Sequence, residues 1–257
     1  MHLSDGIEII ALEGLPEVEA GADLAALIRG ALAAGDLALM SHDVLVVAQK
    51  IVSKCEGRSV DLRTVSPGAE ALRLAALTGK DARLVEVILS QSQSIVRAAR
   101  GVLIVRHRLG FVMANAGVDQ SNVPGAQDAG RALLLPLDPD ASAQALRTEL
   151  MSGAAGPLGI IISDSFGRPW RLGVTNVALG VAGLPAVIDR RGEPDREGRT
   201  LQMTEVALAD AVAAAAGLAM GEADEGTPVV LVRGLKWQAP ASTGRALLRP
   251  MTEDLFR

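Results

Sequence analysis

The chain has 257 residues, a length that favours one large domain or two intertwined lobes. Hydrophobic residues make up 49% and aromatic residues only 2%, so the core must be aliphatic, and a net charge of -5 argues against nucleic acid as a partner. The single Cys, the lack of an apolar stretch near the ~20 residues of a membrane span, and the absence of a signal peptide together predict a cytoplasmic protein with no membrane partner.

Short segments rich in β-branched residues predict the strands Ile7–Leu12, Val44–Ala48, Val102–Val105, Leu158–Ile162 and Val229–Val232. Ser66 and Pro67 are typical of an N-cap and a first helical residue, Gly79 would end that helix, and Asp81 can cap the next one. Further helices are predicted over Asp140–Met151 and Gln202–Met220, the second rich in Ala and buried on most of its circumference.

The predicted loops are Val118–Gly130 and Asp189–Gly198. No repeat or linker divides the chain, which predicts a single domain over residues 1–257, with two lobes as the variant. Because strands and helices do not alternate regularly, we expect an α+β fold with mixed sheets and helices.

The segment N-A-G-V-D-Q-S-N-V follows the apolar run Phe111–Ala114 and so should lie at the end of a strand. Asp119 offers a hard oxygen ligand for magnesium or manganese, and Asn122 can donate to or accept from a nucleotide. The alternative is an Asx turn in which these side chains only satisfy backbone groups.

The segment I-I-S-D-S-F-G-R-P-W-R is predicted to end a buried strand at Asp164 and Ser165. A carboxylate beside a hydroxyl is a pair that holds divalent cations in phosphoryl-transfer sites, and Arg168 and Arg171 can clamp anionic oxygens. A capped turn with solvated arginines is an equally good interpretation.

Two of the four lysines in the chain, Lys50 and Lys54, follow an apolar strand in V-V-A-Q-K-I-V-S-K. A point-charge ammonium suits a phosphate, although solvated lysines on a helix face would look the same. In M-G-E-A-D-E-G-T-P, Glu222 projects a carboxylate from a Gly-rich loop, and the alternative is a glycine C-cap at Gly221 followed by an acidic surface loop.

Six ordered segments between about Gly14 and Gly234 resemble the coenzyme F420-0:L-glutamate ligases, also called gamma-glutamyl ligases. They are G-L-P-E-V, A-Q-K-I-V-S-K-C-E-G-R, N-A-G-V-D-Q-S-N-V, L-L-L-P-L-D-P-D, S-D-S-F-G-R-P-W-R-x-G and M-G-E-x-x-E-G. Such a resemblance implies a butterfly-like, intertwined homodimer and a GTP-dependent amide ligase with two Mg²⁺ or Mn²⁺ ions per active site, K⁺ being a further candidate. The chain is expected to lack the flavin-dependent reductase domain that actinobacterial relatives carry.

By this resemblance the metal ligands fall on Asp119, Asp164, Ser165 and Glu222, with Ser165 standing where many relatives have Thr. The nucleotide contacts fall on Gly14, Leu15, Pro16, Glu17, Gln49, Lys50, Lys54, Asn122, Met220, Gly221, Glu222, Ala223, Asp224, Glu225, Gly226 and Thr227. Lys50 and Arg168 are the predicted catalytic residues, because both can add fixed positive potential.

The expected reaction begins when GTP phosphorylates the terminal carboxylate of the lactyl-phosphate arm of coenzyme F420-0. The amino group of L-glutamate then attacks the acyl phosphate, and the product can be extended to a gamma-glutamyl tail. Two alternatives remain: a related nucleotide-dependent amide ligase for another carboxylate, and a non-catalytic nucleotide-binding protein. The second predicts the loss of a metal ligand, and all four positions retain an oxygen ligand.

Overall fold

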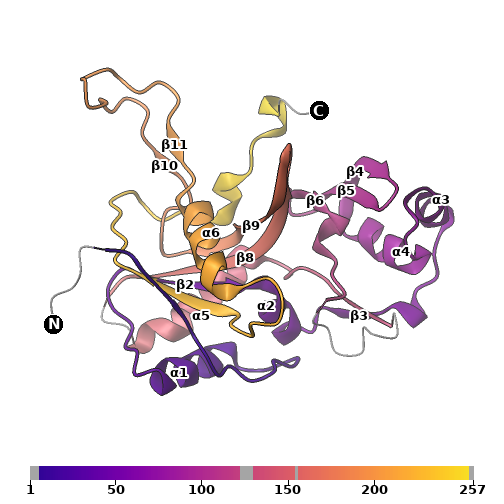
Figure 1. Cartoon of the computed structure of the whole chain (residues 1–257), viewed down its shortest axis with the longest axis horizontal. Coiled ribbons are helices and arrows are strands. Elements are labelled where there is room, and N and C mark those ends of the chain that lie inside the picture. The colour runs from indigo at the N-terminus through magenta and orange to yellow at the C-terminus, as the bar shows by residue number, and fades with distance from the viewer. Residues whose placement is uncertain (1–5, 122–129, 154–155, 255–257) are drawn as a thin grey trace.

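The computed structural model describes residues 6–121, 130–153 and 156–254. Within these ranges the centre of the protein is a mixed five-stranded sheet with the order β1-β12-β2-β8-β9 (Figure 1). Its strands are β1 (Glu8–Ala11), β2 (Asp43–Ala48), β8 (Leu158–Arg168), β9 (Arg171–Ala182) and β12 (Val229–Arg233). Strands β2 and β8 are parallel, whereas the other neighbouring pairs are antiparallel.

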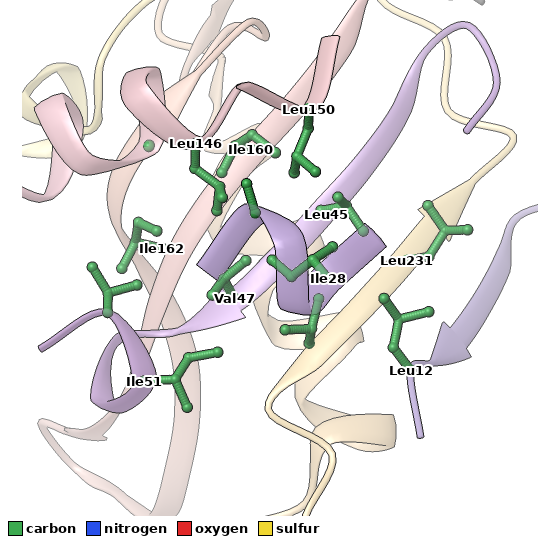
Figure 2. Packing of buried hydrophobic residues seen from close by; sticks show 14 of the residues in the cluster. Leu12, Ile28, Leu45, Val47, Ile51, Leu146, Leu150, Ile160, Ile162 and Leu231 are labelled. Carbon is green, nitrogen blue, oxygen red and sulfur yellow. The ribbon is translucent and has the colours of Figure 1, made fainter. Parts of the chain in front are cut away.

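Helices cover both faces of this sheet, which explains why β2 and the first half of β8 are continuously apolar. On one face lie α1 (Leu24–Ala34), α2 (Gln49–Cys55) and α5 (Pro139–Leu150). Figure 2 shows Ile28, Ile51 and Leu146 of these helices packed on that face. The Ala-rich helix α6 (Leu208–Met220) packs on the other face.

A second lobe has a hydrophobic core of its own, which includes Leu62, Leu74, Ile88 and Leu103. It contains α3 (Ala69–Thr78), α4 (Ala82–Ser90), the antiparallel pair β3 (Ser59–Asp61) and β7 (Arg131–Leu133), and the sheet β4 (Ser92–Ala99), β5 (Val102–His107) and β6 (Val112–Ala114). A hairpin of β10 (Ile188–Asp189) and β11 (Glu205–Val206) projects from the main body (Figure 1).

The structure confirms the α+β class and all five predicted strands. Gly79 ends α3 in the left-handed conformation at φ 73°, and the Asp81 side chain accepts the Arg83 N–H at the start of α4. Helix α5 lies within one residue of its predicted bounds, with Asp138 as its N-cap. Only Ala211 and Leu218 of α6 are exposed, as expected for a largely buried helix.

Three predicted boundaries are wrong. Helix α3 begins after Gly68 rather than at Pro67, because Glu86 of α4 accepts the Gly68 N–H and holds the chain in an extended entry. The segment 202–207 is not helical, since Glu205 and Val206 pair with β10. Strand β8 does not end at Asp164 but continues to Arg168, because β9 pairs with it from Ile160 to Arg168.

The predicted loop Asp189–Gly198 forms the end of the β10–β11 hairpin, apart from Asp189 itself. Most of the predicted loop Val118–Gly130 lies outside the described residues. No helix in the described part of the chain is long and apolar enough to cross a membrane.

Candidate functional site

A cleft of about 750 Å³ opens where β2 ends and β8 continues. The last residue of β2, Ala48, pairs with Ser163, so the edge of β8 beyond Ser163 is no longer covered by β2. The cleft is lined by residues from six separate parts of the chain. They are Leu15, Pro16, Glu17, Val18, Ala48, Gln49, Lys50, Ile51, Lys54, Gln120, Ser163, Asp164, Ser165, Asn176, Met220, Gly221, Glu222, Ala223, Asp224, Glu225, Gly226, Thr227 and Pro228.

The two lysines of the cleft lie on α2, which begins directly after β2. The Lys50 ammonium lies 2.7 Å from Asp119 Oδ2, and the Lys54 ammonium lies 2.5 Å from Glu17 Oε1. The Lys54 side chain is only 14% exposed, whereas the Glu17 side chain is 65% exposed. The lysines are therefore not ordinary solvated surface residues, and each has a carboxylate as its partner.

Asp119 is positioned by a tight turn after β6. Asn115, Ala116 and Gly117 all have positive φ values of 53°, 54° and 66°. A Cβ at position 117 would lie 2.7 Å from the Leu135 side chain, so the turn requires Gly there. Asp119 then pairs with Leu133 through backbone hydrogen bonds.

The Asp119 carboxylate accepts the backbone N–H and the hydroxyl of Ser121, each at 2.8 Å. This is the Asx turn of the alternative interpretation, and it exists together with the ion pair to Lys50. Burial raises the pKa of Asp119, but the hydrogen bonds from Lys50 and Ser121 outweigh burial and lower the pKa overall. Asp119 is therefore a carboxylate anion in this environment.

Asp164 and Ser165 lie on β8 just past the end of β2. The pKa of Asp164 is raised to about 7, mainly by burial and to a smaller extent by the neighbouring carboxylates Asp119 and Glu222, against the opposing effects of the Ser165 N–H and Lys50. A desolvated carboxylate near two others is an arrangement that an added cation would stabilise.

The loop after α6 lines the cleft together with α2. Gly221 is the C-cap of α6 at φ 75°, as the structural interpretation of this glycine predicted. The Thr227 hydroxyl lies 3.0 Å from the carbonyl oxygens of Ala219 and Met220, to which it donates, so it satisfies the end of the helix. Glu225 accepts the Ala223 N–H at 2.8 Å, a hydrogen bond within the loop that stabilises its conformation.

Most residues expected at the site line this single cleft, but Arg168, Gly14 and Asp119 are not among its lining residues. Arg168 is exposed near the tip of the β8–β9 hairpin and donates to the Leu172 carbonyl oxygen, because β8 continues past the cleft instead of ending beside it. Gly14 lies just before the lining residue Leu15 and does not itself line the cleft. Asn122 is outside the described residues.

Sequence reasoning did not select the polar residues Gln120, Ser163 and Asn176, which line the cleft, and the last two are buried. Asn176 of β9 is 7% exposed, and its Nδ2 donates to Glu222 Oε1 at 2.7 Å. Ser163 is 1% exposed, and its hydroxyl has no hydrogen-bond partner among the described residues. Each of these two is a polar residue within a largely apolar part of its strand, and that interruption is the signal that could have found them.

No three Asp, Glu, His or Cys side chains in the described ranges converge into a preformed metal centre. Asp119 is engaged with Lys50, and Glu222 with Asn176. The four residues predicted as metal ligands nevertheless lie in or beside one cleft, since Asp119 is bonded to Lys50 and precedes the lining residue Gln120.

Comparison with known proteins places the chain among the ligases. The sequence profile described as F420-0:Gamma-glutamyl ligase matches residues 14–234, and the chain belongs to this family. The matched range contains every described residue that lines the cleft.

Relatives with the name coenzyme F420:L-glutamate ligase are similar over nearly their whole length. The protein of Methanothermobacter thermautotrophicus is 48% identical over 254 residues, covering 98% of this chain and 99% of its own. That of Methanopyrus kandleri is 45% identical over 259 residues with the same coverage. That of Methanocaldococcus jannaschii is 44% identical over 216 residues, covering 84% of each chain.

Proposed function

We propose that this protein is a GTP-dependent ligase of coenzyme F420 biosynthesis that joins L-glutamate to the lactyl carboxylate of coenzyme F420-0. The observation that carries the proposal is that segments matched by the family profile, distant in sequence, line one cleft with two lysines and several carboxylates. A gamma-glutamyl tail would form if the product returned as the acceptor.

The chemistry requires activation, because a carboxylate does not accept an amine directly. In the proposed first step a carboxylate oxygen of coenzyme F420-0 attacks the γ-phosphorus of GTP, GDP leaves, and an acyl phosphate forms. The glutamate amine, once deprotonated, attacks the acyl carbon, and inorganic phosphate leaves as the amide forms. Lys50 and Lys54 would stabilise anionic oxygens during both steps.

The residues present fit two divalent cations, Mg²⁺ or Mn²⁺. Asp119, Asp164, Ser165 and Glu222 supply hard oxygen ligands, and the raised pKa of Asp164 reflects burial beside two other carboxylates. When bound, the cations would neutralise charge on the phosphate oxygens. K⁺ remains a further candidate on the resemblance alone.

The proposal includes a homodimer. The β8–β9 hairpin carries large apolar side chains in solvent, with exposed fractions of 83% for Trp170, 98% for Leu172 and 52% for Val174. Such a projecting apolar strand pair suits a second copy of the chain. Sedimentation velocity should find a dimer for the wild type and a monomer for Leu172→Glu, and a monomeric wild type would overturn this part of the proposal.

The acceptor distinguishes the proposal from its main alternative, a ligase for another carboxylate. We expect turnover with coenzyme F420-0 and GTP, much less with ATP, and none with unrelated carboxylates. Coenzyme F420-0 labelled with ¹⁸O in its carboxylate should transfer one ¹⁸O to the released phosphate. Equal rates with GTP and ATP would contradict the assignment of GTP as the nucleotide. Release of phosphate without ¹⁸O would contradict the acyl-phosphate intermediate.

A further inference from the structure

Asn176 of β9 lines the cleft. It is the cross-strand partner of Ser165 in the β8–β9 pair, so the two side chains lie on the same face of the sheet. The residue is 7% exposed and is followed along β9 by the buried or half-buried apolar residues Val177 and Ala178. A buried amide in such a strand is costly unless it is hydrogen-bonded.

The Asn176 amide uses this position to hold Glu222. Its Nδ2 donates to Glu222 Oε1 at 2.7 Å, across 46 residues of sequence. Glu222 itself is exposed on the loop after α6, where an unrestrained side chain would sample several rotamers. The bond to a buried partner therefore selects one direction for the Glu222 carboxylate.

The partner of Glu222 differs in charge from the partners of Asp119 and Glu17. Asp119 and Glu17 are paired with the ammonium groups of Lys50 and Lys54, which compensate their charge. The Asn176 amide is neutral, so it orients Glu222 without cancelling its negative charge. An oriented carboxylate whose hydrogen-bond partner is neutral is suited to a cation.

Helix α6 is shaped to accommodate this contact. Gly217 packs against Asn176, and a Cβ at position 217 would lie 2.5 Å from Asn176 Nδ2. Glycine inside a helix costs about 1 kcal/mol relative to Ala, so its presence here requires a reason. The close approach of α6 to Asn176 provides that reason independently of the hydrogen bond.

We infer that Asn176 is a positioning residue that acts through Glu222, holding this carboxylate in the cleft on the side of Ser165 so that both can bind the same divalent cation. The inference rests on the cation site of the proposed function.

The test measures Mn²⁺ binding to the nucleotide-free protein by the electron paramagnetic resonance signal of free Mn²⁺. Asn176→Leu keeps the approximate volume and removes the donor, and we expect about tenfold weaker Mn²⁺ binding with little change in melting temperature. Thr175→Val is the matched control, because residue 175 points to the opposite face of β9 and should leave Mn²⁺ binding unchanged.

A double-mutant cycle shows whether the effect passes through Glu222. In a Glu222→Gln background, Asn176→Leu should cause no further loss of Mn²⁺ affinity. Unchanged Mn²⁺ affinity in Asn176→Leu, or an equal loss in both backgrounds, would overturn the inference. If Asn176→Leu does not fold, Gly217→Ala replaces it, since the added methyl displaces the Asn176 amide. Unchanged Mn²⁺ affinity in Gly217→Ala, or an equal loss with and without Glu222→Gln, would then overturn the inference.

A third variant separates this inference from the proposed function. Asp164→Asn should also weaken Mn²⁺ binding, whatever the role of Asn176. If Asp164→Asn binds Mn²⁺ like the wild type, the cation site itself is wrong. If Asp164→Asn weakens binding and Asn176→Leu does not, only the positioning role fails.

Discussion

The Lys50 ammonium lies between Asp119 Oδ2, at 2.7 Å, and the Ser121 hydroxyl, at 2.8 Å. Lys50 is a candidate for phosphate binding and Asp119 is a candidate metal ligand, so this ion pair joins the two proposed roles. Under the proposed function, a cation that binds Asp119 would compete with Lys50, and the Lys50 ammonium would then be available to an anionic ligand in the cleft. Binding of the cation at Asp119 and binding of an anionic ligand at Lys50 would therefore be coupled, because the cation would free the Lys50 ammonium for that ligand.

Lys50→Met tests this coupling because it should change two affinities in opposite directions. Without its competitor, Mn²⁺ should bind the nucleotide-free protein about two- to fivefold more tightly, the range expected for a partly exposed ion pair. GTP should bind more weakly, because a positive charge is lost. Isothermal titration with each ligand measures both effects, and weaker Mn²⁺ binding in the variant would contradict the competition.

Lys54→Ala should weaken GTP binding by about tenfold and affect the glutamate requirement less, since a charged hydrogen bond to phosphate is lost. The matched variant is Glu17→Gln, which releases Lys54 from its exposed partner. That variant should bind GTP as tightly as the wild type or more tightly. A raised KM for glutamate with unchanged GTP affinity would remove Lys54 from the phosphate site.

Asp164→Asn should reduce turnover by about a hundredfold or more, because a neutral amide is a much weaker ligand for a hard dication. The fold should stay intact, since the amide fills the same space at a position where burial disfavours the charged form. Steady-state rates at limiting Mn²⁺ and a thermal melt check both points. Activity near the wild-type level would show that Asp164 binds no essential cation.

His107 gives the second lobe a pH-dependent stability. Burial, followed by the charges of Arg108 and Arg58, lowers its pKa to about 4, and its Nδ1 accepts the Leu109 N–H at 2.9 Å. Because the unfolded chain takes up a proton near pH 6.5 and the folded protein only near pH 4, the unfolded state binds more protons between these values. Stability is therefore lost as the pH falls through this window, by up to about 3 kcal/mol.

The variant His107→Gln keeps a hydrogen-bond acceptor and cannot titrate. Urea unfolding from pH 7 to pH 4 should show a smaller loss of unfolding free energy in this variant than in the wild type. Subtracting the two curves removes the contribution of the carboxylates that both proteins share. Parallel curves would mean that His107 is not held neutral by its surroundings.

Sequence patterns predicted buried strands well because burial on both faces leaves a continuous apolar run, as in β2. The same signal failed at Asp164, because an apolar run ends where burial ends, whereas β8 continues as long as β9 pairs with it. Strand β11 was missed for a related reason: its two exposed residues are defined by pairing with β10 and not by their own pattern.

The residues of the candidate site were also predicted only in part. Ordered motifs brought together residues that the fold does place around one cleft. Arg168 was assigned to the site because it follows Asp164 closely in sequence, but in a long strand four residues carry it out of the cleft. Asn176 could not be assigned a role, since its partners Ser165 and Glu222 come from strand pairing and helix docking far along the chain.

The central claim is tested most directly by mass spectrometry of coenzyme F420-0 after incubation with the purified protein, GTP, L-glutamate and Mn²⁺ or Mg²⁺. The account predicts a product heavier by one or more glutamyl residues, with one GDP and one phosphate released per residue added, and no product when GTP, glutamate or the metal is omitted or when Asp164→Asn replaces the wild type. An unmodified precursor in the complete mixture, with the protein folded and all components intact, would contradict it.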